Sequence, residues 1–209
     1  MYSLAIESIV GSKLEDGIKN RALGICNSAH IHTNEGQIFD ILMSYKDFSK
    51  EEGYIEMATL KTAVPIAASI KFGSIIGNAT EEEMENLGRY GCCVGLAFQI
   101  KDDIIDISKN KGRELGTDLR KGNKTLMVIK TLEKANDEVK KRLLKVLGNN
   151  KAGNDEVNEI IRIIKESGSM EYAEDYARNN IKEAKKYLQK VKLNKNSFEF
   201  FNKFADYVV

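Results

Sequence analysis

The sequence predicts an all-α protein. Its 209 residues contain a single proline, and no stretch shows the alternation of apolar and polar residues that marks a half-buried strand. Alanine, leucine, isoleucine, glutamate and lysine, most of which favour helices, are frequent throughout. There is no internal repeat, proline-rich linker or low-complexity tract, and a chain of this length can bury a sizeable core. Residues 1–209 are therefore expected to form a single helical domain.

The first helices are predicted from apolar spacing and capping residues. Residues 2–10 fit a short helix, and residues 14–30 fit a second one. Thr33 and Asn34 can cap a further helix that begins near Glu35. These signals predict a break in the chain at Thr33.

Two capping-box patterns predict the next helices. Ser49, followed three residues later by Glu52, opens a helix that runs to about residue 77. Pro65 lies inside this helix and removes one backbone donor, so a bend is expected near Lys61 and Thr62.

Thr80 and Glu83 form the second capping box, at the start of the longest predicted helix, residues 80–106. Its middle, "GCCVGLAFQI", has no polar face, so the helix is expected to be buried in a larger bundle. Residues 108–124 contain three glycines and many charges and are predicted to form a loop. The remaining helices are predicted at residues 125–135, 137–148, 153–167, 169–191 and 196–207.

Composition limits the classes of partner. The formal net charge is +1, so no overall field attracts nucleic acid or a membrane surface. No segment approaches the length of an apolar membrane span, and the first residues lack a signal-peptide pattern. Cys26, Cys92 and Cys93 show no CxxC spacing and are expected to be reduced, packed thiols. A cytoplasmic protein without a transmembrane segment is expected.

A cluster of acids follows the apolar middle of the longest helix. The stretch "FQIKDDIIDI", residues 98–107, holds Asp102, Asp103 and Asp106 within five positions. Gln99, Asp102 and Asp106 share one stripe, while Asp103 lies about 100° further round. Mg²⁺ is commonly held by one or two carboxylates, waters and substrate phosphates. The alternative is a solvated helix end, because acid clusters are common on protein surfaces.

The next segment is basic and rich in glycine. In "GRELGTDLRKGNKT", glycines allow backbone amides to approach an anion, and positive charge comes from Arg113, Arg120, Lys121 and Lys124. It is not a Walker loop, because the GxxxxGK[ST] pattern is absent and no strand precedes it. Acidic and basic groups facing one space could hold a diphosphate together with a metal ion.

Four motifs together resemble one family. "YGCCVGLAFQIKDDIIDI" and "GRELGTDLRKGNKTL" resemble the second aspartate-rich motif and the following loop of the trans-isoprenyl diphosphate synthases, or polyprenyl synthetases. "EGQIFDI" resembles the family's G-Q-x-x-D at Gly36, Gln37 and Asp40, and "LKTAVPIAASIKFGSIIG" its K-T-A helix. The motifs occur in the family's order over about residues 33–130, which makes the resemblance more specific than any single motif.

The resemblance implies a helical bundle of the isoprenoid synthase type and a Mg²⁺-dependent prenyltransferase. Such an enzyme joins an allylic diphosphate to isopentenyl diphosphate in isoprenoid biosynthesis. Asp102 would be the direct metal ligand, with Asp103 and Asp106 in or near the water shell of the metal. Lys61, Asp102 and Gln99 are the candidate catalytic residues.

The resemblance also implies residues at the substrates. Each has a plainer alternative: a surface lysine, an apolar core residue, or a helix cap. The implied contacts are Lys61 and Thr62 at the allylic diphosphate, Phe98 and Gln99 beside the substrate pocket, and Gln37 and Asp40 on the facing helix.

The chain departs from the family pattern in two ways. Asn123 stands where the family has a lysine directly after the glycine, and Lys124 follows one place later as its candidate replacement. No second DDxxD pattern is present, whereas the family's first aspartate-rich motif lies on earlier helices. The chain is therefore expected to be N-terminally truncated relative to the usual fold.

Three functions remain open. The first is an isoprenyl diphosphate synthase chain that needs a partner for full activity, and the second is a non-catalytic subunit of a heteromeric synthase. The third is a single-motif diphosphate lyase or terpene cyclase. The retained acids, lysine and glutamine favour the first. An apolar face where further helices would pack is expected to make the protein a homo-oligomer or hetero-oligomer.

Overall fold

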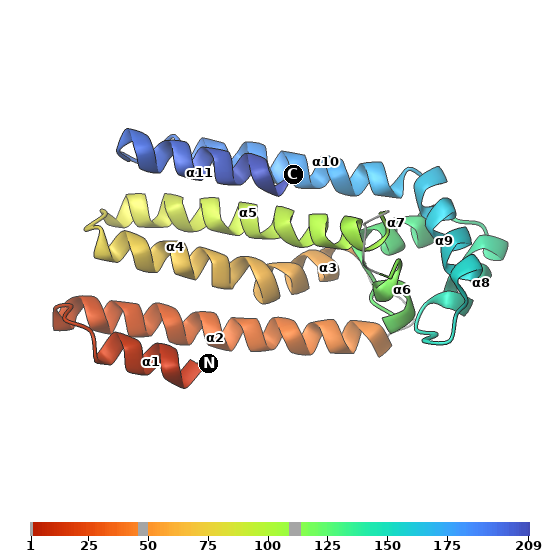
Figure 1. The fold of residues 1–209 in the computed structure, drawn as a ribbon, viewed down its shortest axis with the longest axis horizontal. Helices are drawn as coiled ribbons and strands as arrows, with labels where there is room; N and C mark the ends of the chain where they lie inside the picture. The colour runs from red at the N-terminus through yellow and green to blue at the C-terminus, as the bar shows by residue number, and fades with distance from the viewer. Residues whose placement is uncertain (1, 46–49, 109–113) are drawn as a thin grey trace.

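The computed structural model describes residues 2–45, 50–108 and 114–209, and in these residues no strand is present. The long helices lie along one axis in layers, with α1 and α2 on one side, α4 and α5 in the middle, and α10 and α11 on the other side (Figure 1). The all-α prediction is confirmed for this part of the chain. The layered helices are α1 (Tyr2–Val10), α2 (Asp16–Tyr45), α3 (Glu51–Ala58), α4 (Val64–Ile76), α5 (Glu81–Asp106), α10 (Ser169–Leu188) and α11 (Lys195–Val208).

The central helix is α5, which contacts α4, α10 and α11. It begins with the predicted capping box: Thr80 Oγ1 accepts from the Glu83 backbone N–H, and the Glu83 carboxylate accepts from the Thr80 backbone N–H. Tyr90, Val94 and Ala97 are fully buried. The prediction that its apolar middle lies inside a bundle is confirmed for most of this stretch, although Phe98 is 49% exposed.

The predicted break at Thr33 is wrong, because α2 is continuous. Thr33 Oγ1 donates to the Ala29 carbonyl oxygen and Asn34 Nδ2 to the His30 carbonyl oxygen, both at 2.7 Å. Both side chains therefore bond to the preceding helical turn instead of capping a new helix. As a result α2 has 30 residues and is longer than α5, which has 26.

Near Lys61 and Thr62, where the sequence predicts a bend, the structure has a π-helical turn, η1 (Thr59–Ala63). The Val64 backbone N–H donates to the Thr59 carbonyl oxygen, five residues earlier. Pro65 follows in the first turn of α4, where its missing N–H leaves no regular helical bond to Lys61. Such π turns are often found at functional sites.

Two glycines allow η1 to lie between α2 and α5. A Cβ atom on Gly36 would lie 2.3 Å from the Lys61 backbone nitrogen, and one on Gly95 would lie 2.6 Å from the Ala63 Cα. Neither position leaves room for a side chain. The backbones of α2, η1 and α5 therefore pack directly against one another.

The predicted loop at residues 108–124 is wrong in part, because a short helix, α6, forms within it. Arg113 lies outside the described residues, as does Ser49 of the capping box predicted before α3. The later helices occur close to their predicted positions. Four shorter helices lie together at one end of the long helices, on the right in Figure 1. They are α6 (Thr117–Lys121), α7 (Leu126–Lys134), α8 (Asp137–Val146) and α9 (Asn154–Glu166).

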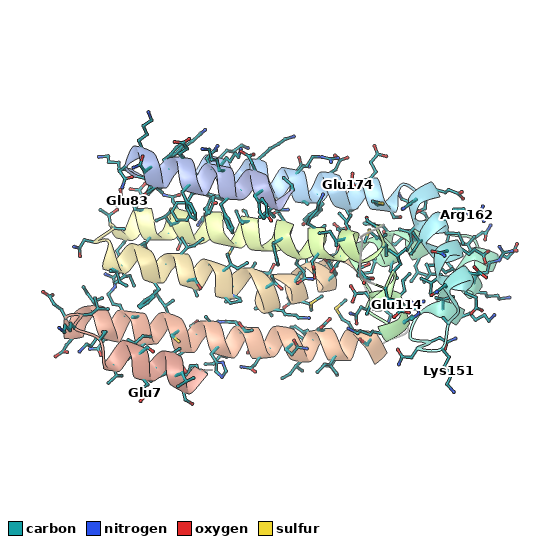
Figure 2. All side chains as sticks on the ribbon, in the orientation of Figure 1. Glu7, Glu83, Glu114, Lys151, Arg162 and Glu174 are labelled. Carbon is teal, nitrogen blue, oxygen red and sulfur yellow. The ribbon has the colours of Figure 1, made fainter. Side chains whose placement is uncertain are left out.

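Charged side chains such as Glu7, Lys151 and Arg162 point outward from the bundle (Figure 2). Within the described ranges, none of the helices is both long enough and apolar enough to cross a membrane. Cys26, Cys92 and Cys93 are free and only partly buried, so their predicted packing is incomplete.

We expect Gly36→Ala to destabilise the protein by about 1–3 kcal/mol, because the added methyl group meets the backbone of η1. Gly24→Ala, in the same helix, is the matched control, since a Cβ there meets nothing within 4 Å. It should be neutral or stabilising by up to about 1 kcal/mol. Urea denaturation measures both, and equal stability of the two variants would contradict the role assigned to Gly36.

Candidate functional site

A cavity of about 430 Å³ lies at the end of the bundle where α2, α3, η1, α5 and α6 meet the start of α7. Its wall combines carboxylates, lysines, amides and a tyrosine, and few of its atoms are apolar. Most of the residues predicted from sequence to bind a metal or diphosphate reach it. The lining residues are Asp40, Tyr54, Met57, Lys61, Gln99, Asp102, Asp103, Asp118, Lys121, Asn123, Lys124 and Thr125.

Lys61 is fixed at the cavity wall by an ion pair. Its Nζ lies 2.6 Å from Asp40 Oδ2, so a side chain of η1 is joined to one of α2. Both side chains are partly buried, with exposed fractions of 32% and 21%, which argues against an ordinary surface lysine. The ammonium group is held where an anion in the cavity could bind it.

Asp103 is a buried part of this wall, with an exposed fraction of 6%. Its Oδ2 accepts a hydrogen bond from the Tyr54 hydroxyl at 2.7 Å, and its Oδ1 accepts from Gln99 Nε2 at 2.9 Å. Burial raises the pKa of Asp103 to about 7, although the two hydrogen bonds act in the opposite direction. Thr62 does not line the cavity, but its hydroxyl donates to Gln99 Oε1 at 2.6 Å.

Asp106 holds the start of α6. Its two carboxylate oxygens accept from the backbone N–H groups of Thr117 and Asp118 at 3.2 and 3.0 Å. The sequence predicted that amides of this glycine-rich segment could bind an anion, and in the structure they bind the carboxylate of Asp106 itself. Asp106 lines a second cavity of about 310 Å³, which shares Asp102 with the first.

The three acids of "DDIID" therefore have different surroundings, and their assignment as metal ligands stays a prediction. Asp102 is exposed and lines both cavities, Asp103 points to Tyr54, and Asp106 binds α6. Adjacent residues of a helix point about 100° apart, and the partners come from different elements. Within the described residues, no group of three or more histidine, cysteine or acidic side chains is arranged to hold a metal ion.

Sequence reasoning missed Asp118 as a site residue. It lies on α6 and lines both cavities, as does Lys121. Burial raises the pKa of Asp118, while a hydrogen bond from Asn123 Nδ2 at 2.9 Å opposes that shift. The signal available in the sequence was the position of this acidic residue inside the basic segment "GRELGTDLRKGNKT".

Lys124 reaches the same wall as Asn123. It is buried, and its Nζ donates to the Met43 carbonyl oxygen at 2.6 Å. Asn123, which stands at the position of the family's loop lysine, and Lys124, its candidate replacement, therefore line the same cavity.

Tyr54 was also missed, although it precedes Lys61 by seven residues, about two helical turns. Two predicted residues, Gln37 and Phe98, are exposed and do not line the cavity. Their substrate contacts stay predictions.

The sequence is similar to one described family and to named relatives within it. A family model described as polyprenyl synthetase matches residues 1–164. The short chain isoprenyl diphosphate synthase of Methanothermobacter thermautotrophicus is 35% identical over 193 residues, which cover 90% of this chain and 58% of the relative.

The fold matches solved structures of similar proteins. The geranylgeranyl pyrophosphate synthetase of Pyrococcus horikoshii superposes with a TM-score of 0.91 at 34% identity, over 99% of this chain and 63% of that one. A polyprenyl synthase of Caulobacter crescentus, solved with calcium and isoprenyl diphosphate, matches with a TM-score of 0.83 at 25% identity, over 90% of this chain and 58% of that one. The chain thus spans about three fifths of the length of these relatives.

We expect Asp106→Ala to loosen α6, because two backbone N–H groups lose their acceptor. The loss should be about 1 kcal/mol, as for a helix cap, and it should appear as faster amide hydrogen exchange in residues 116–122. Asp102→Ala is the control, because Asp102 lies on the same helix but accepts neither of these two hydrogen bonds, and it should leave this exchange unchanged. Unaltered protection in Asp106→Ala would contradict the assignment.

Proposed function

The chain belongs to the polyprenyl synthetase family, and we propose that it is a Mg²⁺-dependent prenyltransferase chain that condenses an allylic diphosphate with isopentenyl diphosphate. The observation that carries the proposal is that Lys61 on η1 and Asp102 on α5 line the same cavity. A cation beside a carboxylate is the pairing needed to bind a diphosphate directly and through a metal ion.

Lysines supply the direct part of diphosphate binding in this proposal. Lys61 comes from η1, Lys121 from α6, and Lys124 from the segment before α7. Their charges would stabilise the diphosphate as it leaves the allylic carbon. The Asp40 carboxylate, now paired with Lys61, holds the ammonium group in place until the anion arrives.

The acids fit a metal ion that is shared with the substrate. Asp102 and Asp118 line the same cavity, and Mg²⁺ often takes one or two carboxylates, with waters and phosphates completing its shell. We assign Asp102 as the direct ligand, with Asp118 beside it. The metal, when bound, supplies positive charge that neutralises the diphosphate. The Caulobacter crescentus relative, solved with calcium and isoprenyl diphosphate, supports a divalent cation.

The other two predicted ligands act less directly in this proposal. Asp103 orients Gln99, since both of its oxygens accept protein hydrogen bonds. Asp106 positions Asp118 by holding the start of α6.

The reaction exchanges one bond for another. The carbon–oxygen bond of the allylic diphosphate breaks, and diphosphate leaves with the electron pair. The double bond of isopentenyl diphosphate attacks the allylic carbon, and the resulting cation loses a proton to a base, for which the released diphosphate is available. The protein holds the reactants together and keeps water away from the carbocation.

We propose that the carboxylates facing Asp102 come from polypeptide outside these 209 residues, in a partner or in a longer chain. The sequence contains one DDxxD pattern, and it spans about three fifths of the length of its relatives. Large apolar side chains on α2 are exposed and could bind further helices. They include Ile31, Ile38, Ile41 and Leu42.

Wild-type protein is expected to bind inorganic pyrophosphate more tightly with Mg²⁺ than without it, because Asp102 would hold the metal ion and the ion would supply positive charge to the pyrophosphate. Lys61→Met and Asp102→Ala should each weaken binding in Mg²⁺ by at least about tenfold, equal to about 1.4 kcal/mol. Isothermal titration calorimetry measures this.

Lys101→Met is the matched control, because Lys101 is adjacent to Asp102 in sequence but lines neither cavity. Equal pyrophosphate affinity in all variants, with and without Mg²⁺, would contradict the proposal. In an assembled enzyme, prenyl transfer unaffected by Asp102→Ala would favour the non-catalytic subunit. Transfer by the purified chain alone would contradict the need for a partner.

The protein is expected to associate at micromolar concentration, because apolar side chains of α2 are exposed. Light scattering after size-exclusion chromatography should give a mass above that of one chain, 23.5 kDa. Ile38→Lys should reduce that mass, whereas Leu144→Lys, at an exposed position of α8, should not. A monodisperse wild-type monomer would contradict the prediction.

A further inference from the structure

Three hydrogen bonds in series link α3 to η1 through α5. The Tyr54 hydroxyl donates to Asp103 Oδ2 at 2.7 Å, and Gln99 Nε2 donates to Asp103 Oδ1 at 2.9 Å. The Thr62 hydroxyl completes the series by donating to Gln99 Oε1 at 2.6 Å. Tyr54 and Thr62 are thus connected through two intervening side chains.

Gln99 donates through its Nε2 to Asp103 Oδ1 and accepts through its Oε1 from the Thr62 hydroxyl, so both ends of the carboxamide are used. The hydroxyl proton of Thr62 is then used in this bond, and only its lone pairs remain for other partners. Burial beside Asp103 raises the pKa of Tyr54 well above its ordinary value, so the phenol remains a donor.

Tyr54 is held from its other side as well. One helical turn earlier in α3, Glu51 accepts from the Tyr172 hydroxyl at 2.8 Å and pairs with Lys130 Nζ at 2.5 Å. These partners lie on α10 and α7. The first turn of α3 is therefore held to α10 and α7 by residues that do not line the cavity, and this restrains Tyr54.

We propose that Tyr54 is a positioning residue of the diphosphate site. Acting through Asp103 and Gln99, it fixes Thr62, and with it the adjacent Lys61, relative to α5, which carries Asp102. The π turn that carries Lys61 and Thr62 departs from the regular helical hydrogen-bond pattern, so a side-chain tie to α5 restrains it further. This inference rests on the proposed function, because it assigns Tyr54 a role in that same site.

The test compares two tyrosines that each lose one buried hydroxyl. Tyr54→Phe should weaken Mg²⁺-pyrophosphate binding about tenfold, while Tyr90→Phe should leave the affinity unchanged. Tyr90 is 0% exposed, as against 1% for Tyr54, and its hydroxyl donates to the Phe201 carbonyl oxygen at 2.7 Å. Tyr90 does not line the cavity. Both variants should show a lowered thermal midpoint, so stability alone would not separate them.

A double variant tests the route of the effect. If Tyr54 acts through Thr62, Tyr54→Phe should change affinity by less than about twofold in a Thr62→Val background. A full tenfold loss in that background would overturn the proposal, as would equal pyrophosphate affinities of Tyr54→Phe and wild type.

A spectroscopic measurement does not depend on ligand binding. The side-chain NH₂ signals of Gln99, identified by their loss in Gln99→Met, should shift in Tyr54→Phe and stay in place in Tyr90→Phe. Unshifted signals in Tyr54→Phe would overturn the relay. If wild type binds no Mg²⁺-pyrophosphate while the Gln99 signals shift as expected, the proposed function fails and the relay stands.

Discussion

The site depends on direct backbone packing between α2 and η1. Gly36 contributes no side chain at the point where the Lys61 backbone nitrogen approaches it, and Gly95 does the same on the side of α5. Since nothing separates the three backbones, short side-chain bonds can form across them. Asp40 therefore forms an ion pair with Lys61, and Gln99 of α5 accepts a hydrogen bond from the Thr62 hydroxyl. The elements that carry Asp40, Lys61 and Gln99 therefore meet without intervening side chains.

The sequence predicted most of the helices because their signals are local. The capping box at Thr80 and the apolar run after it depend on neighbouring residues, and both occur as predicted. The break at Thr33 failed because threonine can bond back to the previous turn as well as cap a new one. The short helix at Thr117 was missed because its start is bound by Asp106, eleven residues earlier. Partners that are distant in sequence leave no periodic signal.

The same reasoning explains which parts of the site were predicted. Lys61, Asp102 and Gln99 were identified by motif and do reach the cavity. What the motif could not show is that two of its three acids bind groups of the protein itself. Isolated buried carboxylates are costly, so Asp103 is accompanied by two donors. These two acids shape the site through the elements they join, and Asp102 is the exposed acid of the three.

The π turn has a consequence for how the chain tolerates length changes. A π turn contains one residue more than the α-helical turn it replaces, so η1 is equivalent to a one-residue insertion in a helix. Deleting a residue there would restore the regular pattern and rotate Tyr54 by about 100° relative to α4. Pro65 opposes this reversion, because its ring would meet the carbonyl of the preceding turn. The proline therefore helps to retain the extra residue of η1. The direction in which α3 presents its side chains is retained with it.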